Sequence, residues 1–273
     1  MGALPMGGGL AGIVVMLVLA LLGGGKILGG GGGSSFPVPG FDQVPAAAPA
    51  GDQPLPGAPD PDAKLVDFVS FVLDDVQTLW AEQFRATGES YSDAKLVLFT
   101  SAVRSGCGQA SSATGPFYCQ LDRTVYLDLE FFRELSRRFQ APGDFAQAYV
   151  IAHEIAHHVQ TLLGISDRVR ELGDRNRDDV NELSVRQELQ ADCFAGVWTY
   201  TTYRRGILEA GDLDEGLTAA AAIGDDRIQE TTTGRVDPES FTHGTSEQRV
   251  KWFTRGFQSG DADSCDTFAA DKV

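Results

Sequence analysis

The fold and the chemistry of this chain are decided by the stretch AHEIAHH at residues 152–158. It contains His153, Glu154 and His157 in the spacing H-E-x-x-H. On an α-helix, residues four apart lie on one face, about one turn apart along the axis. Both imidazoles can therefore bind one metal ion, with Glu154 beside them to accept a proton from metal-bound water. This pattern is typical of zinc-dependent peptidases.

The residues around this motif predict a buried helix over residues 145–163. Asp144 is the expected N-cap and Gly164 the expected stop. A buried helix with three ionisable residues needs partners for them, because unpaired buried polar groups are costly, and metal ligation supplies such partners. The alternative is a surface helix with two incidental histidines. His158 points about 100° away from His157, so we expect a structural role for it rather than ligation.

A zinc site of this kind needs a third protein ligand. One known extension of the motif requires glycine and histidine where this chain has Gln160 and Leu163, so that class is excluded. Another uses a glutamate followed four residues later by an aspartate, and Glu188 and Asp192 fit it. We predict Glu188 as the third ligand and Asp192 as the acceptor of a ligand histidine's free ring N–H. An acidic helix surface is the alternative.

Peptide hydrolysis also needs a hydrogen-bond donor for the oxyanion that develops on the carbonyl. His243 is the one histidine outside the motif, and it is the first candidate for this role. Tyr149 and Arg249 are weaker candidates, and a capping or packing role for His243 stays open. The sequence therefore predicts Glu154 and His243 as catalytic residues.

The composition limits the classes of function. The chain has 273 residues and a formal net charge of −16. Nucleic-acid binding is excluded, because phosphate contacts need clustered lysine and arginine, and adhesion to anionic lipid through surface charge is disfavoured. Residues 61–273 can form one core, and we expect an α+β fold, a mainly helical zincin-like domain with a small β-sheet. The expected helices lie at 62–85, 166–179, 181–205, 212–223 and 246–258, the strands at 95–100, 117–120 and 124–129, and a turn at 224–227.

The N-terminal region predicts attachment to a membrane. Residues 1–28 contain an apolar run that is short for a spanning helix, which needs about 20 residues. A signal peptide is the alternative, but a small-residue cleavage site is not evident after the run. Residues 29–60 are rich in Gly, Pro and Ala and read as a linker. We expect a single-pass transmembrane helix with the catalytic domain extracytoplasmic.

Four cysteines predict two disulfides. The even count and the local spacing suggest pairs Cys107–Cys119 and Cys193–Cys265. Such bridges form in an oxidising compartment, which agrees with an extracytoplasmic domain. The alternatives are four buried thiols or zinc ligation by thiolates, and the lack of a C-x-x-C pair argues against the latter.

Longer stretches of the chain resemble the neutral zinc metallopeptidase family of bacteria over residues 60–270. The likeness is carried by GDFAQAYVIAHE at 143–154, SVRQELQADC at 184–193, AIGDDR at 222–227, HGTSEQR at 243–249 and CDTF at 265–268. Ala156 stands where the family often has glycine, and since both are small we expect no loss of function. The resemblance implies a peptidase with an N-terminal hydrophobic anchor, and it names no substrate.

The leading hypothesis is a membrane-anchored zinc peptidase with one zinc ion per chain and a peptide or protein as substrate. The first alternative is a catalytically silent zinc-binding scaffold of the cell envelope. The second is an interaction protein in which the H-E-x-x-H pattern is coincidental. The presence of Glu154 weighs against the scaffold, because metal binding alone does not require that carboxylate.

Overall fold

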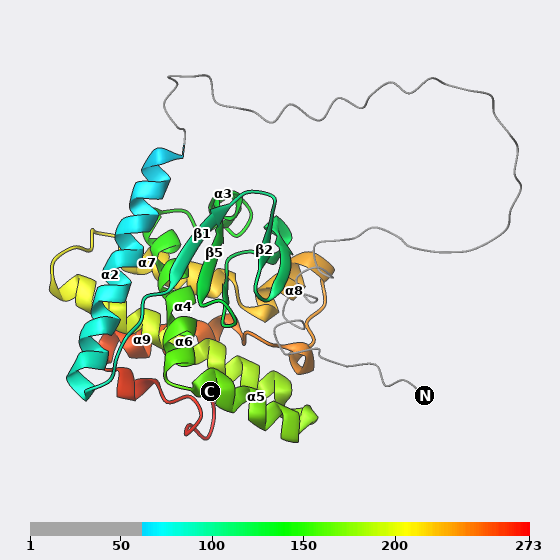
Figure 1. Ribbon diagram of the computed structural model, residues 1–273. Coiled ribbons are helices and arrows are strands. Elements are labelled where there is room, and N and C mark those ends of the chain that lie inside the picture. The colour runs from blue at the N-terminus through cyan, green and yellow to red at the C-terminus, as the bar shows by residue number, and fades with distance from the viewer. Residues whose placement is uncertain (1–61) are drawn as a thin grey trace, which may run out of the picture.

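The computed structural model describes residues 62–273, and Figure 1 shows their arrangement. These residues are mainly helical with a small sheet, which confirms the predicted α+β class. The predicted transmembrane helix at residues 1–28 and the predicted linker at 29–60 lie outside the described residues. Within 62–273, no helix has both the length and the apolar character that crossing a membrane requires.

The predicted helices and strands are present, with ends that differ by a few residues. The described helices are α2 (Ala63–Thr87), α3 (Leu129–Arg137), α4 (Asp144–Leu162), α5 (Ile165–Arg175), α6 (Val180–Arg204), α7 (Asp212–Ala222), α8 (Asp225–Thr233) and α9 (Ser246–Ser259). The described strands are β1 (Lys95–Phe99), β2 (Ala102–Ser105), β3 (Gly108–Ser111), β4 (Phe117–Cys119) and β5 (Thr124–Asp128).

The sheet has the strand order β1-β5-β4. Strands β1 and β5 run parallel, whereas β4 runs antiparallel to β5 with Phe117 opposite Tyr126. Strands β2 and β3 form a separate antiparallel hairpin, which Figure 1 shows beside the sheet. Strand β4 is therefore an edge of its sheet, and an edge strand can pair with a further extended segment.

Three parts of the fold differ from the sequence prediction. The β2–β3 hairpin was missed because its residues, AVRS and GQAS, lack a regular apolar alternation. Helix α3 was missed because it follows β5 directly: the Asp128 carboxylate accepts a hydrogen bond from the Glu130 backbone N–H at 3.0 Å and starts the helix. The predicted turn at 224–227 is the beginning of α8, where two aspartates suit a helix N-terminus.

Helix α4, which carries the H-E-x-x-H motif, is buried along most of its length, as predicted. It packs against α2, α6 and α7. Its N-cap is Gly143 rather than the predicted Asp144. The Phe145 backbone N–H donates at 3.1 Å to the carboxylate of Glu215 on α7, and a side chain at Gly143 would overlap that carboxylate. A distant side chain thus replaces the local cap.

Helices α6 and α9 cross at very short distance. A Cβ atom added at Gly196 of α6 or at Gly256 of α9 would overlap a backbone carbonyl oxygen of the other helix. Only glycine permits such a close approach of two backbones. The crossing brings the side chain of Arg249 on α9 to Asp192 on α6.

Both predicted disulfides are present in the structure. The bridge Cys107–Cys119 ties the turn of the β2–β3 hairpin to strand β4. The bridge Cys193–Cys265 ties α6 to the C-terminal segment. The second bridge lies one residue beyond Asp192, so it also restrains the part of α6 that carries Glu188.

Candidate metal centre

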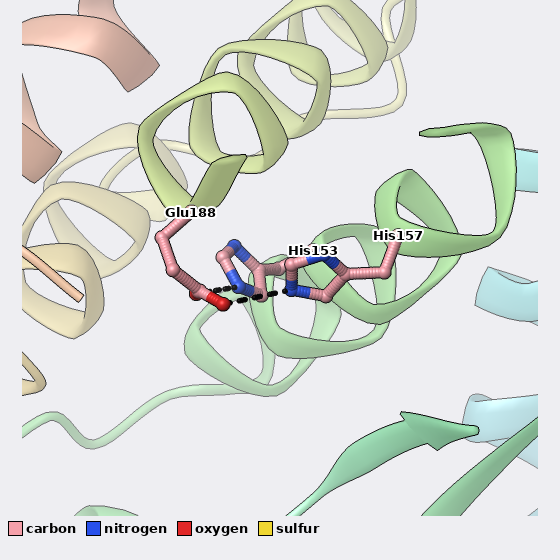
Figure 2. Close-up of side chains that lie close together, drawn as sticks. All are labelled: His153, His157 and Glu188. Carbon is pink, nitrogen blue, oxygen red and sulfur yellow. Dashed lines mark hydrogen bonds and ion pairs between the residues drawn. The ribbon is translucent and has the colours of Figure 1, made fainter. Parts of the chain in front are cut away.

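Helices α4 and α6 bring the three predicted ligands together. One ligand atom each of His153, His157 and Glu188 lies within 4.8 Å of the others. The Nε2 atom of His153 is 3.1 Å from one carboxylate oxygen of Glu188, and the Nε2 atom of His157 is 3.4 Å from the other (Figure 2). Two nitrogen donors and one carboxylate therefore converge on one point. A tetrahedral zinc site with an open fourth position requires such a set of three protein ligands.

The Nδ1 atoms of the two histidines are held by other side chains. His153 Nδ1 lies 2.9 Å from a carboxylate oxygen of Asp192, as predicted. His157 Nδ1 lies 2.9 Å from the amide oxygen of Gln160, and the amide nitrogen of Gln160 donates at 2.8 Å to the Gln187 carbonyl oxygen. Both acceptors place the ring proton on Nδ1 and leave the Nε2 lone pair for a metal. The role of Gln160 was missed, although its spacing of three from His157 was a usable signal.

Asp192 is itself held by two buried side chains. Arg249 donates to both of its carboxylate oxygens, at 2.8 and 2.9 Å, and the Tyr149 hydroxyl donates to one of them. The sequence makes Tyr149 and Arg249 the weaker candidates for the oxyanion donor. In the structure the Tyr149 hydroxyl and the Arg249 guanidinium contact Asp192, where they fix the carboxylate that orients the ring of His153.

The electrostatics of the centre favour a cation. Burial alone would lower the pKa of His153, but the Asp192 and Glu188 carboxylates outweigh it and raise the pKa to about 9. Burial alone would raise the pKa of Glu188, but His157 and His153 outweigh it and hold that pKa well below its usual range. A positive charge between these carboxylates is thus stabilised strongly enough to keep a buried imidazole protonated. A divalent cation fits the same donor set and can take the place of that proton.

Glu154 lies between the two histidines in sequence and shares a cavity with them. The cavity has a volume of about 1010 Å³. Its lining residues from the candidate metal centre are His153, Glu154, His157, Glu188 and His243. Burial raises the pKa of the Glu154 carboxyl. A carboxylate next to a metal centre, with a pKa raised above its usual range, is suited to accept a proton and release it again.

His243 also lines this cavity, at the start of the segment that leads into α9. Its Nδ1 atom lies 3.1 Å from a carboxylate oxygen of Asp225, and its backbone N–H donates at 2.6 Å to the other oxygen. Burial alone would lower the pKa of His243, but the hydrogen bond to Asp225 outweighs it and raises the pKa. The part played by Asp225 was missed, because sequence reasoning had assigned it only a cap or a bridge to arginine.

His158 points away from the three converging ligand atoms, as predicted from the helix geometry. Its Nδ1 atom lies 3.0 Å from the Tyr118 hydroxyl and its Nε2 atom 2.6 Å from the Ser92 carbonyl oxygen. Burial lowers the pKa of His158. The residue therefore joins α4 to the sheet as a neutral ring.

The fold and the site define an α+β protein whose candidate metal centre combines an H-E-x-x-H helix with a glutamate from a second helix. The chain belongs to the family described as putative neutral zinc metallopeptidase, which matches residues 2–268. This confirms the resemblance seen in the sequence motifs.

Relatives of the chain occur in Escherichia coli and in Mycobacterium tuberculosis. It is 54% identical over 202 residues to the uncharacterized protein YpfJ of Escherichia coli (strain K12), covering 74% of this chain and 70% of YpfJ. It is 48% identical over 191 residues to the uncharacterized protein Rv2575 of Mycobacterium tuberculosis, covering 66% of this chain and 64% of Rv2575. No solved structure matches the chain. The activity must therefore be argued from the site itself.

Proposed function

We propose that this protein is a zinc-dependent peptidase with a zincin-like catalytic domain. One observation carries the proposal: the Nε2 atoms of His153 and His157 meet the carboxylate of Glu188 in a cavity that Glu154 also lines. These three groups would hold one zinc ion. Metal ligation explains why three ionisable side chains converge in a largely buried place.

The proposed mechanism gives each of the surrounding polar side chains one role. When bound, zinc would supply a Lewis acid that activates water and polarises the peptide carbonyl. Glu154 accepts a proton from the attacking water and passes it to the leaving amine. The Asp225 carboxylate accepts from Nδ1–H of His243 and favours the imidazolium form, whose Nε2–H can donate to the developing oxyanion. Asp192, fixed by Arg249, holds the ring of His153 in the ligating orientation.

The proposed location is outside the cytoplasm, on a single-pass membrane anchor. The two disulfides support an oxidising compartment. The predicted anchor at residues 1–28 and linker at 29–60 would hold the catalytic domain of residues 61–273 near the bilayer. The peptide or protein substrate would reach the cavity from the extracytoplasmic side.

The direct test measures zinc per chain in the purified protein and its cleavage of casein, an extended protein substrate. We expect about one zinc ion per chain, and cleavage that a chelator stops and added zinc restores. A chain that takes up no zinc at neutral pH would contradict the metal site. Zinc without cleavage of casein or of a random peptide library would favour the silent scaffold.

Replacement of His243 with alanine is expected to reduce kcat by about 10²- to 10³-fold, the range observed for the loss of one oxyanion donor. Zinc content should be unchanged, because His243 is not among the three converging ligands. Steady-state kinetics and metal analysis of the same preparation check both statements. Unchanged kcat would leave His243 with a structural role at the start of α8.

A further inference from the structure

Strand β4 forms part of the wall of the cavity that contains the metal centre. Phe117 and Tyr118 of this strand line the cavity together with His153 and His157. A strand of three residues has few sheet hydrogen bonds, so sheet pairing alone holds it weakly. Among the further attachments of strand β4 are the disulfide from Cys119 and the hydrogen bond between the side chains of Tyr118 and His158.

The hydrogen bonds of His158 have a definite direction. The Ser92 carbonyl oxygen can only accept, so the Nε2 atom 2.6 Å away carries the ring proton. The Nδ1 atom then has a free lone pair and accepts from the Tyr118 hydroxyl at 3.0 Å. One neutral ring therefore connects the segment before β1 with strand β4.

The orientation of this ring is fixed by its surroundings. His158 is fully buried. The ring of Tyr91 meets it edge-on at a centroid distance of 5.5 Å, and the ring of Tyr118 does so at 5.4 Å. A ring flip would place carbon atoms against the Ser92 oxygen and the Tyr118 hydroxyl, and both hydrogen bonds would be lost.

The same turn of α4 carries a metal ligand and the attachment of β4. His157 and His158 are consecutive, and their side chains point about 100° apart around the helix axis. His157 meets Glu188, while His158 meets Tyr118. The place of β4 relative to the metal centre is therefore set through one rigid helical turn, the kind of support that keeps a binding site in its productive geometry.

We propose that His158 is a positioning residue: its Nδ1 atom holds Tyr118, and through it the edge strand β4, where an extended peptide can pair with the strand and reach the metal centre. This inference rests on the proposed peptidase function and names the substrate form as a peptide in extended conformation. Main-chain pairing with β4 binds substrate and transition state alike, so its loss raises KM and leaves kcat unchanged.

Two substitutions of His158 separate its two hydrogen bonds. In His158→Asn the amide oxygen stands three bonds from Cα, as Nδ1 does, and can accept from Tyr118. In His158→Gln the amide nitrogen stands four bonds from Cα, as Nε2 does, and can donate to Ser92. Each variant loses one bond of the pair, so they are matched controls for stability. Tyr118→Phe removes the same bond as His158→Gln.

The experiment uses the full chain, loaded with zinc, and casein as the probe. For His158→Gln and Tyr118→Phe we expect KM to rise about five- to tenfold, the effect of one lost hydrogen bond, with kcat and zinc content unchanged. His158→Asn should keep a KM close to that of the wild type. The double variant of His158→Gln and Tyr118→Phe should be no worse than either single one, because both act on one bond.

Equal rises of KM in the Asn and Gln variants, or additive effects in the double variant, would overturn the inference and leave His158 as a packing residue. Hydrogen exchange of the backbone amides of residues 117–119 supplies a readout without catalysis. Exchange should be faster in His158→Gln than in His158→Asn. If the wild type cleaves no casein, the peptidase proposal fails, and equal exchange in the two variants would separately overturn the positioning role.

Discussion

Replacement of Glu188 with alanine is expected to abolish tight zinc binding and, with it, peptidase activity. The carboxylate of Glu188 meets the Nε2 atoms of both histidines, so it is the only converging ligand from the second helix. Structural zinc sites with four ligands bind with about 10–16 kcal/mol, or roughly 3 kcal/mol per ligand. Loss of one ligand therefore weakens zinc binding by at least about a hundredfold. Competition with a chromogenic chelator measures this change.

The matched control is Glu182→Ala on the same helix. Glu182 is exposed and pairs with Arg186 at 2.8 Å, so its removal should leave zinc affinity as in the wild type. Circular dichroism and thermal unfolding of both variants show whether α6 is intact. Wild-type zinc affinity in folded Glu188→Ala would exclude Glu188 as a ligand and require a different third donor.

The arrangement of the metal centre was predictable where the helix repeat determines it. His153 and His157 are four residues apart, and so are Glu188 and Asp192. Each pair therefore shares one face of its helix. The spacing alone does not show that the two helix faces meet. We inferred this contact because a zinc site needs a third protein ligand. The structure brings these side chains together as the spacing predicts, while metal ligation itself stays a proposal.

The groups behind the ligands were less accessible to sequence reasoning. Tyr149 had a local signal, since it precedes His153 by four residues on the same helix face. Arg249 had none: it reaches Asp192 only because two glycines let α6 and α9 cross closely. The hydrogen bond between Asp225 and His243 likewise depends on how α8 meets the following segment. Such tertiary contacts produce no repeating pattern in the amino-acid sequence, so they cannot be predicted from residue spacing.

The secondary structure shows the same difference: elements determined by the local sequence were predicted, and elements that depend on distant contacts were not. Helix α2, which has a regular apolar repeat, was predicted within a few residues of its observed ends, and so was α6. The β2–β3 hairpin was not, because its pairing is stabilised by the Cys107–Cys119 bridge and by the Asp122 carboxylate, which accepts from the Gly106 backbone N–H at 2.6 Å. The N-terminus of α4 was misplaced because Glu215 on α7 supplies the acceptor there.

Replacement of Glu154 with glutamine is expected to reduce kcat by roughly 10³-fold while zinc remains bound. Glutamine keeps the volume of the buried side chain but cannot accept the proton of the attacking water. In the wild type, burial raises the pKa of Glu154, so kcat should fall as the pH drops through this raised pKa, where the carboxylate becomes protonated. This acid limb should be missing in Glu154→Gln. Casein cleavage across a pH series measures both effects.

Glu130→Gln is the matched control, because Glu130 is an exposed carboxylate that lines the same cavity from α3. It should keep the kcat, the acid limb and the zinc content of the wild type. Zinc bound equally by all three proteins, with cleavage lost only in Glu154→Gln, separates a peptidase from a zinc-binding scaffold, since a scaffold has no use for the proton acceptor. Cleavage by Glu154→Gln at the wild-type rate would remove the mechanism and assign the observed proteolysis to a contaminant or to another site.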